Sequence, residues 1–192
     1  DQEIIDEVSR NGGNAIMTSK NHKTGTDRVF EALTIINRKD IHYVMNVQGD
    51  EPDFDVNDLK NLNSKMIKNN AKIGTLAAKI STKEMYQNEN VVKVKIDEPF
   101  EKNSFPIAKN FMRKTKENFN VFHHLGIYCY DVEILKRFIS FNQSKNELDN
   151  RLEQLRALDN NININVGLAN KSPIGVDTKE DYLALKNIMK YN

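Results

Sequence analysis

The chain has 192 residues, which is enough to bury one substantial hydrophobic core. Hydrophobic residues make up 39% of it and charged residues 29%, a balance typical of a folded globular protein rather than a disordered one. The 28 basic and 27 acidic side chains nearly cancel, which argues against binding to nucleic acid or to an anionic membrane through a global field. Any polyanion must therefore be bound locally.

The chain shows no internal repeat, linker or change in composition, so we expect a single domain over residues 1–192. No apolar run approaches the roughly 20 residues that span a bilayer, and the first residues have neither the basic end nor the apolar stretch of a signal peptide. We therefore expect a cytoplasmic protein without a membrane partner.

Segments rich in β-branched and aromatic residues alternate with segments of helical periodicity. The predicted strands are 15–18, 42–47, 73–80, 91–96, 125–130 and 164–168. The predicted helices are 27–38, 152–158 and 181–189, and Thr178 with Asp181 three residues on gives the start of the last one the outline of a capping box. This alternation predicts an α/β fold with a mixed, mostly parallel sheet flanked by helices. Ligands of such sheets bind beyond the carboxyl ends of the strands.

The sequence NVQGDEP (46–52) lies at such a strand end. It brackets two carboxylates, Asp50 and Glu51, between a flexible glycine and a rigid proline. A carboxylate there is suited to Mg²⁺, which takes one or two protein carboxylates and leaves its other positions to water and substrate phosphates. The alternative is a polar turn in which Asp50 caps the next helix.

The sequence MTSKNHKTGTDR (17–28) follows the first predicted strand. It supplies hydroxyl groups, a glycine and Arg28 at the expected start of a helix, a combination that suits a nucleotide or phosphate. The same residue types cap helices without any ligand, so both interpretations stay open. Asp177, in the sequence GVDT, is equally either a turn residue or a second metal ligand facing Asp50.

Several enzyme classes lose support. The four histidines and the single cysteine have none of the spacings of a zinc site. The chain also lacks the nucleophile elbow of serine hydrolases, the Walker loop of P-loop ATPases and the Rossmann fingerprint of dinucleotide dehydrogenases.

Taken in order, MTSxxHxxGTDR, NVQGDEP, HLGIY, LEQLRAL and GVDT resemble the 3-deoxy-D-manno-octulosonate (KDO) cytidylyltransferases, or CMP-KDO synthetases. The resemblance implies a glycosyltransferase-A-like nucleotidyltransferase fold, that of the nucleotide-diphospho-sugar transferases. It also implies the reaction of CTP with KDO to give CMP-KDO and pyrophosphate, which supplies lipopolysaccharide assembly. Mg²⁺ as cofactor and a homodimer are further implications of the same resemblance.

The resemblance also implies roles for individual residues. It makes Asp50 and Asp177 the magnesium ligands and adds Arg28 to them as the catalytic residues. The residues it places beside the sugar are Gln48, His124, Tyr128, Glu153 and Gln154. The residues it places beside the nucleotide are Thr26, Asp27, Arg28, Thr75, Leu76 and Ala77, the last three as a strand end that offers backbone groups to cytosine.

The sequence departs from the family pattern in two places. Family members open with a strand and a basic loop that holds the triphosphate, so we expect about 50 residues of that pattern to be missing before Asp1. The segment 98–111 also lacks the family's aromatic-Ser-Arg stretch, and its Phe105, Ile107 and Phe111 are either dimer surface or ordinary core. Two alternatives remain, namely a cytidylyltransferase for another acid sugar and a non-catalytic nucleotide-binding module of the same fold.

Overall fold

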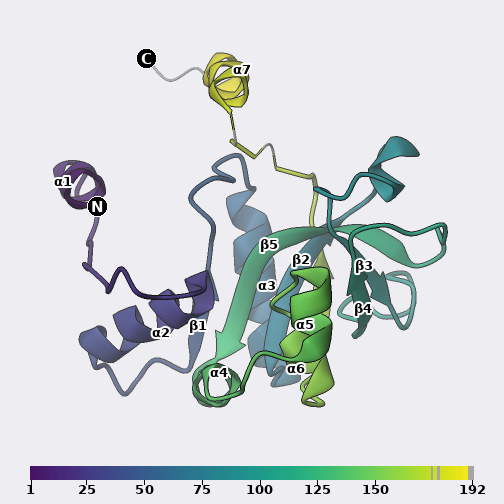
Figure 1. Cartoon of the computed structure of the whole chain (residues 1–192), viewed down its shortest axis with the longest axis horizontal. Coiled ribbons are helices and arrows are strands. Elements are labelled where there is room, and N and C mark those ends of the chain that lie inside the picture. The colour runs from purple at the N-terminus through teal and green to yellow at the C-terminus, as the bar shows by residue number, and fades with distance from the viewer. Residues whose placement is uncertain (174, 177, 190–192) are drawn as a thin grey trace.

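The structure is a computed structural model, and it describes residues 1–173, 175–176 and 178–189. The helices are α1 (Gln2–Arg10), α2 (Gly25–Ile36), α3 (Val56–Asn69), α4 (Val132–Ile139), α5 (Lys145–Asn150), α6 (Leu155–Asp159) and α7 (Lys179–Met189), with a short 3-10 helix η1 (Glu84–Tyr86) (Figure 1). The strands are β1 (Tyr43–Asn46), β2 (Ile73–Ala78), β3 (Lys93–Ile96), β4 (Ala108–Met112), β5 (Val121–Asp131) and β6 (Ile164–Leu168).

The long strand β5 organises the sheet. β2 lies antiparallel along one of its edges, while β1 and β3 pair antiparallel with opposite ends of β5. β6 continues the sheet parallel to β2, and β4 continues it antiparallel to β3. The predicted mixed sheet flanked by helices is thus confirmed, and β1, β2, β3 and β6 all run in one direction.

The expectation of mostly parallel neighbours was nevertheless wrong, because among the described strands only β2 and β6 are paired in parallel. The reason is the position of β5. This strand runs opposite to β1, β2 and β3 and lies between β2 on one edge and β1 and β3 on the other, so strands of the same direction are kept apart.

Two hydrophobic clusters cover the two faces of the sheet. On one face, α2, α4 and α6 pack Leu33, Leu135 and Leu155 against the strands. On the other face, α3 packs Leu62 and Met66. Phe105 and Phe111, which the sequence left open as dimer surface or core, are both buried in these clusters.

One predicted strand is absent. Residues 15–18 pair with no strand of the described chain, and Ile16 and Met17 are 38% and 47% exposed. A strand needs neighbouring backbone to satisfy its N–H and C=O groups, and β-propensity alone does not supply it. Among the described residues, no helix is long and apolar enough to cross a membrane.

Gly74 in β2 is the position where added volume should cost the most stability. A methyl group there would lie 2.5 Å from Met66 Sδ, 3.0 Å from Leu62 Cδ1 and 3.2 Å from Phe105 Cζ. We expect Gly74→Ala to lower the free energy of unfolding in urea by about 2 kcal/mol, because the packed side chains must move apart. Gly49→Ala is the control, since a methyl group there meets nothing within 4 Å. Equal effects of the two substitutions would contradict this account of the packing.

Candidate active site

Segments that are far apart in the sequence meet where β1 ends. Asn46, the last residue of β1, is buried and pairs with Tyr128 of β5. A Cβ added at Gly25, where α2 begins, would lie 3.8 Å from Asn46 Nδ2 and 4.0 Å from Gln48 Nε2. A Cβ added at Gly126 of β5 would lie 3.4 Å from Gln48 Cγ. These distances show that α2 and β5 both lie against Gln48 in the loop after β1.

An irregularity in β5 shapes this region. Thr75 of β2 pairs with Tyr128, but the next residue, Leu76, pairs with Leu125. Gly126 and its successor are thus extra residues on the β5 side, which is the arrangement of a β-bulge. Bulges re-aim side chains, and this one lies beside Gln48.

The Thr75 hydroxyl group stabilises the bulge. It is completely buried and donates to the carbonyl oxygen of Ile127 at 2.8 Å, while the carbonyl oxygen of Leu125 lies 3.3 Å away as a weaker acceptor. His124 Nε2 lies 3.0 Å from the same hydroxyl oxygen. Thr75 thereby fixes both the course of β5 and the orientation of the His124 ring.

His124 is held as a neutral ring within an aromatic row. Its ring centroid is 5.0 Å from that of Phe111 and 5.4 Å from that of Tyr128. Burial, with a smaller effect of the neighbouring His123, lowers the pKa of His124 to about 3. His124 is therefore neutral at physiological pH and acts by hydrogen bonding rather than by charge.

The structure contradicts the strand-end position predicted for Thr75, Leu76 and Ala77. They lie in the middle of β2, and all three are buried. β5 flanks their backbone on one side and β6 on the other. Their position at a strand end was thus predicted wrongly, while their place beside the nucleotide stays a prediction.

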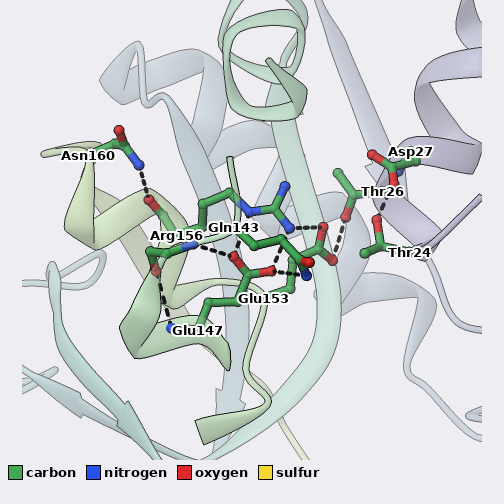
Figure 2. Close-up of polar contacts among 9 residues, drawn as sticks. Thr24, Thr26, Asp27, Gln143, Glu147, Glu153, Arg156 and Asn160 are labelled. Carbon is green, nitrogen blue, oxygen red and sulfur yellow. Dashed lines mark hydrogen bonds and ion pairs between the residues drawn. The ribbon is translucent and has the colours of Figure 1, made fainter. Parts of the chain in front are cut away.

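Glu153 precedes α6 and faces the first turn of α2. Its Oε2 accepts a hydrogen bond from the Thr26 hydroxyl group at 3.0 Å (Figure 2). Its Oε1 is buried, has no hydrogen-bond partner among the described residues and lies 3.6 Å from Arg156 Nη2. Burial raises the pKa of Glu153, against the opposing effects of hydrogen bonds from Thr26 and Thr24 and of the Arg156 charge. The hydroxyl group of Thr26 is thus bonded to Glu153, and its predicted contact with the nucleotide stays a prediction.

Tyr128 carries a second buried polar atom that lacks a partner. Its hydroxyl oxygen makes no hydrogen bond to any described residue. Its ring stacks on that of Tyr130 at 5.7 Å between centroids. Burial, and then the charges of Tyr130 and Glu153, raise the pKa of Tyr128 well above its usual value, so the phenol keeps its proton. A ligand that carries hydroxyl groups would give both Tyr128 and Glu153 a partner.

Asp50 lies on the solvent side of this site. It is exposed and forms no ion pair with the described residues. Its carbonyl oxygen accepts a hydrogen bond of 2.8 Å from the Val176 amide group, which joins the chain after β6 to the loop after β1. Asp177 itself lies outside the described residues. An exposed carboxylate without a cationic partner fits Mg²⁺, which commonly uses one or two protein carboxylates.

The remaining predicted residues lie around this centre. Arg28 Nη1 donates to Thr18 Oγ1 at 2.5 Å and to the Ser19 carbonyl oxygen at 3.1 Å, so it ties residues 18–19 to α2. Asp27 lies in the first turn of the same helix, where its amide group donates to Thr24 Oγ1 at 3.2 Å. Gln154 stands at the N-terminal cap of α6 without a capping hydrogen bond from its side chain.

The sequence analysis missed two residues of the site, Glu147 and Arg156. Both are buried, and the guanidinium group of Arg156 lies between the carboxylates of Glu147 and Glu153 (Figure 2). The signal available in the sequence was the spacing of three residues between Glu153 and Arg156, which places opposite charges on neighbouring helix positions.

Comparisons with known proteins identify the family of this chain. A family model described as Cytidylyltransferase matches residues 1–164. The 3-deoxy-manno-octulosonate cytidylyltransferase of Thermodesulfovibrio yellowstonii is 38% identical, over 94% of this chain and 75% of that protein. The protein of the same name from Afipia carboxidovorans is 37% identical, over 97% of this chain and 76% of that protein. The chain thus spans about three quarters of the length of these relatives.

Solved structures show the same relationship. The structure of CMP:2-keto-3-deoxy-manno-octonic acid synthetase complexed with CTP superposes with a TM-score of 0.86 at 28% identity, over 99% of this chain and 78% of that chain. UDP-glucose pyrophosphorylase complexed with UDP-glucose gives a TM-score of 0.66 at 13% identity, over 99% of this chain and 73% of that chain. The likeness to this second enzyme confirms the expected nucleotide-diphospho-sugar transferase fold. From its sequence relatives and the first structure, the chain belongs to the cytidylyltransferase family, in the group of the 3-deoxy-manno-octulosonate cytidylyltransferases.

Proposed function

We propose that this protein transfers CMP from CTP to the anomeric hydroxyl group of KDO and releases pyrophosphate. The names of its relatives and the CTP complex of its structural neighbour support the reaction. The observation in this chain that carries the proposal is the pair of buried polar atoms without a hydrogen-bond partner among the described residues, Tyr128 Oη and Glu153 Oε1. Such atoms are costly to leave unpaired and are satisfied by a ligand with several hydroxyl groups.

In this proposal the sugar lies against β5 and the loop before α6. Tyr128 keeps its proton because its pKa is raised, and it therefore donates a hydrogen bond to a sugar oxygen. Glu153 in its ionised form accepts a hydrogen bond from a sugar hydroxyl group at Oε1. Gln48, beside the bulge at Gly126, and the neutral ring of His124 complete the sugar side. Gln154 extends it at the start of α6.

The reaction brings like charges together, because CTP is a polyanion and KDO carries a carboxylate. The protein therefore has mainly to position the two substrates and to reduce their repulsion. We propose that Asp50 and Asp177 hold Mg²⁺, and the hydrogen bond from Val176, the residue before Asp177, to Asp50 supports this pairing. When bound, Mg²⁺ neutralises phosphate charge and makes a coordinated hydroxyl group a better nucleophile.

Further parts of the proposal rest on the family resemblance. Arg28 and Asp27, at the start of α2, lie on the nucleotide side. The enzyme works in the cytoplasm as a homodimer, and its product supplies lipopolysaccharide assembly.

The test measures pyrophosphate release by the complete gene product. With CTP, Mg²⁺ and KDO we expect turnover, and with N-acetylneuraminate in place of KDO we expect kcat/KM to be at least about a hundredfold lower. Faster turnover with the other acid sugar would assign a different substrate. Binding of CTP in calorimetry without turnover of either sugar would favour a non-catalytic module.

A further inference from the structure

We propose that Glu147 is a positioning residue for Glu153. It holds the guanidinium group of Arg156 and so prevents Arg156 from closing onto the carboxylate oxygen that the sugar needs. This inference rests on the proposed function, because it concerns Glu153 Oε1, which has no hydrogen-bond partner among the described residues and is proposed to bind the sugar.

Arg156 stands between two carboxylates but is hydrogen-bonded to only one of them. Arg156 Nε donates to Glu147 Oε2 at 2.7 Å, and Nη2 donates to Glu147 Oε1 at 2.5 Å (Figure 2). The same Nη2 lies 3.6 Å from Glu153 Oε1, which is beyond a hydrogen bond. The Arg156 side chain is only 4% exposed, so water does not screen this competition strongly.

Glu147 is well placed to hold its partner. Its carboxylate accepts hydrogen bonds from the Ser144 amide group and from Gln143 Nε2, both at 3.2 Å, and the Ser144 contact is part of the capping box of α5. The guanidinium carbon of Arg156 also lies 4.8 Å from the centroid of the Phe138 ring, which is a cation–π contact. The guanidinium group is thus fixed to α4 and α5, away from the sugar.

Removing the Glu147 charge would leave a buried guanidinium group without its compensating partner, which is strongly unfavourable. Glu153 is the next carboxylate available. The hydrogen bond and the charge of Glu147 have the largest effects in raising the pKa of Arg156. The charge of Glu153 has the next largest effect, and the charge of Asp27 follows. A movement of less than about 1 Å would bring Nη2 into a normal hydrogen bond with Glu153 Oε1. Glu153 would then be satisfied within the protein and would lose its free acceptor.

The test is Glu147→Gln in the complete gene product. Glutamine keeps the size of the side chain and its capping ability but loses the charge. We expect the KM for KDO to rise about tenfold, while kcat at saturating KDO and the KM for CTP stay within about twofold. Glu133→Gln is the control, because it removes the charge of an exposed carboxylate on α4 that pairs with Lys136. The control should leave all three constants unchanged.

A rescue variant separates competition from structural damage. In Glu147→Gln/Arg156→Gln the guanidinium group is gone, so nothing occupies Glu153 Oε1, and we expect the KM for KDO to fall below that of Glu147→Gln. If Glu147→Gln does not fold, Gln143→Ala is tested in its place. This variant removes only the 3.2 Å hydrogen bond from Gln143 to Glu147, and the KM for KDO is then expected to rise about twofold.

Two outcomes would overturn the inference. One is an unchanged KM for KDO in the folded variant that is tested, and the other is a double variant whose KM equals or exceeds that of the single variant. The wild-type assay separates these results from a failure of the proposed function. If the wild type does not turn over KDO, the function itself is wrong, whereas if it does and the variants show no selective effect on KM, only the role of Glu147 is wrong.

Discussion

Replacing Asp50 by asparagine is expected to lower kcat about a thousandfold, equivalent to about 4 kcal/mol of transition-state stabilisation. Asparagine keeps the shape of the side chain but removes the charge that would hold Mg²⁺ against the phosphates of CTP. The fold should not change, because Asp50 is exposed and forms no ion pair with the described residues. The hydrogen bond from Val176 reaches the backbone of Asp50 and survives the substitution.

The measurement is pyrophosphate release as a function of Mg²⁺ concentration, together with the melting temperature. Asp149→Asn, which removes another exposed carboxylate, is the control and should leave both kcat and the melting temperature unchanged. Near wild-type turnover of Asp50→Asn at saturating Mg²⁺ would show that Asp50 is not a ligand. Lost turnover together with a lowered melting temperature would assign it a structural role instead.

The parts of the fold that the sequence predicted are those with the strongest local pattern. β2 and β6 come from runs of apolar residues because the sheet is covered on both faces there. The start of α7 was predicted from two residues, and the structure confirms the capping box, in which Thr178 Oγ1 accepts from the Asp181 amide group at 3.1 Å and Asp181 Oδ2 accepts from the Thr178 amide group at 2.9 Å. Local chemistry fixes such features without help from the rest of the chain.

The missed elements have weaker patterns. In α3, the buried Leu62 and Met66 stand among many asparagines and lysines, so the apolar stripe is narrow. In β4, only Ala108 and Phe111 are buried, and they are three residues apart because the register with β3 shifts between Lys95 and Ile96. That spacing is not the alternation of a regular strand, so the rule of two-residue periodicity could not find β4.

The site shows a similar division. The sequence motifs indicated Tyr128 and Glu153 through family resemblance, and the structure brings Glu153 onto Thr26, 127 positions earlier in the chain. Motifs did not indicate Glu147 and Arg156, because their significance depends on burial and on which carboxylate Arg156 is bonded to. These are properties of tertiary structure that no local pattern contains.

Replacing Glu153 by glutamine is expected to make the protein more stable and less active. Burial raises the pKa of Glu153 above its usual value of 4.5, so the folded state disfavours the charged form. A carboxyl group whose pKa is higher in the folded state stabilises the protein fully at a pH below its unfolded-state pKa. This stabilisation is lost as the pH rises through the folded-state pKa. Glutamine carries no charge and avoids this loss.

In urea unfolding, the stability difference between Glu153→Gln and the wild type should therefore be near zero at pH 4 and about 1 kcal/mol in favour of the variant at pH 8. Glu101→Gln, at an exposed position, is the control and should show less than about 0.5 kcal/mol at either pH. A variant that is less stable than the wild type at pH 8 would mean that the contacts of Glu153 with Thr26 and Arg156 outweigh the cost of its burial.

Activity should move in the opposite direction. A neutral amide accepts a weaker hydrogen bond from a sugar hydroxyl group than a carboxylate does, and its amino group has no place beside Arg156. We expect kcat/KM for KDO to fall about a hundredfold, while the KM for CTP stays within about twofold. Gained stability with lost activity would show that the charge of Glu153 lowers the stability of the protein and is needed to bind the sugar. Gained stability with unchanged kcat/KM would show that Glu153 does not bind the sugar. It would then also contradict the positioning role proposed for Glu147.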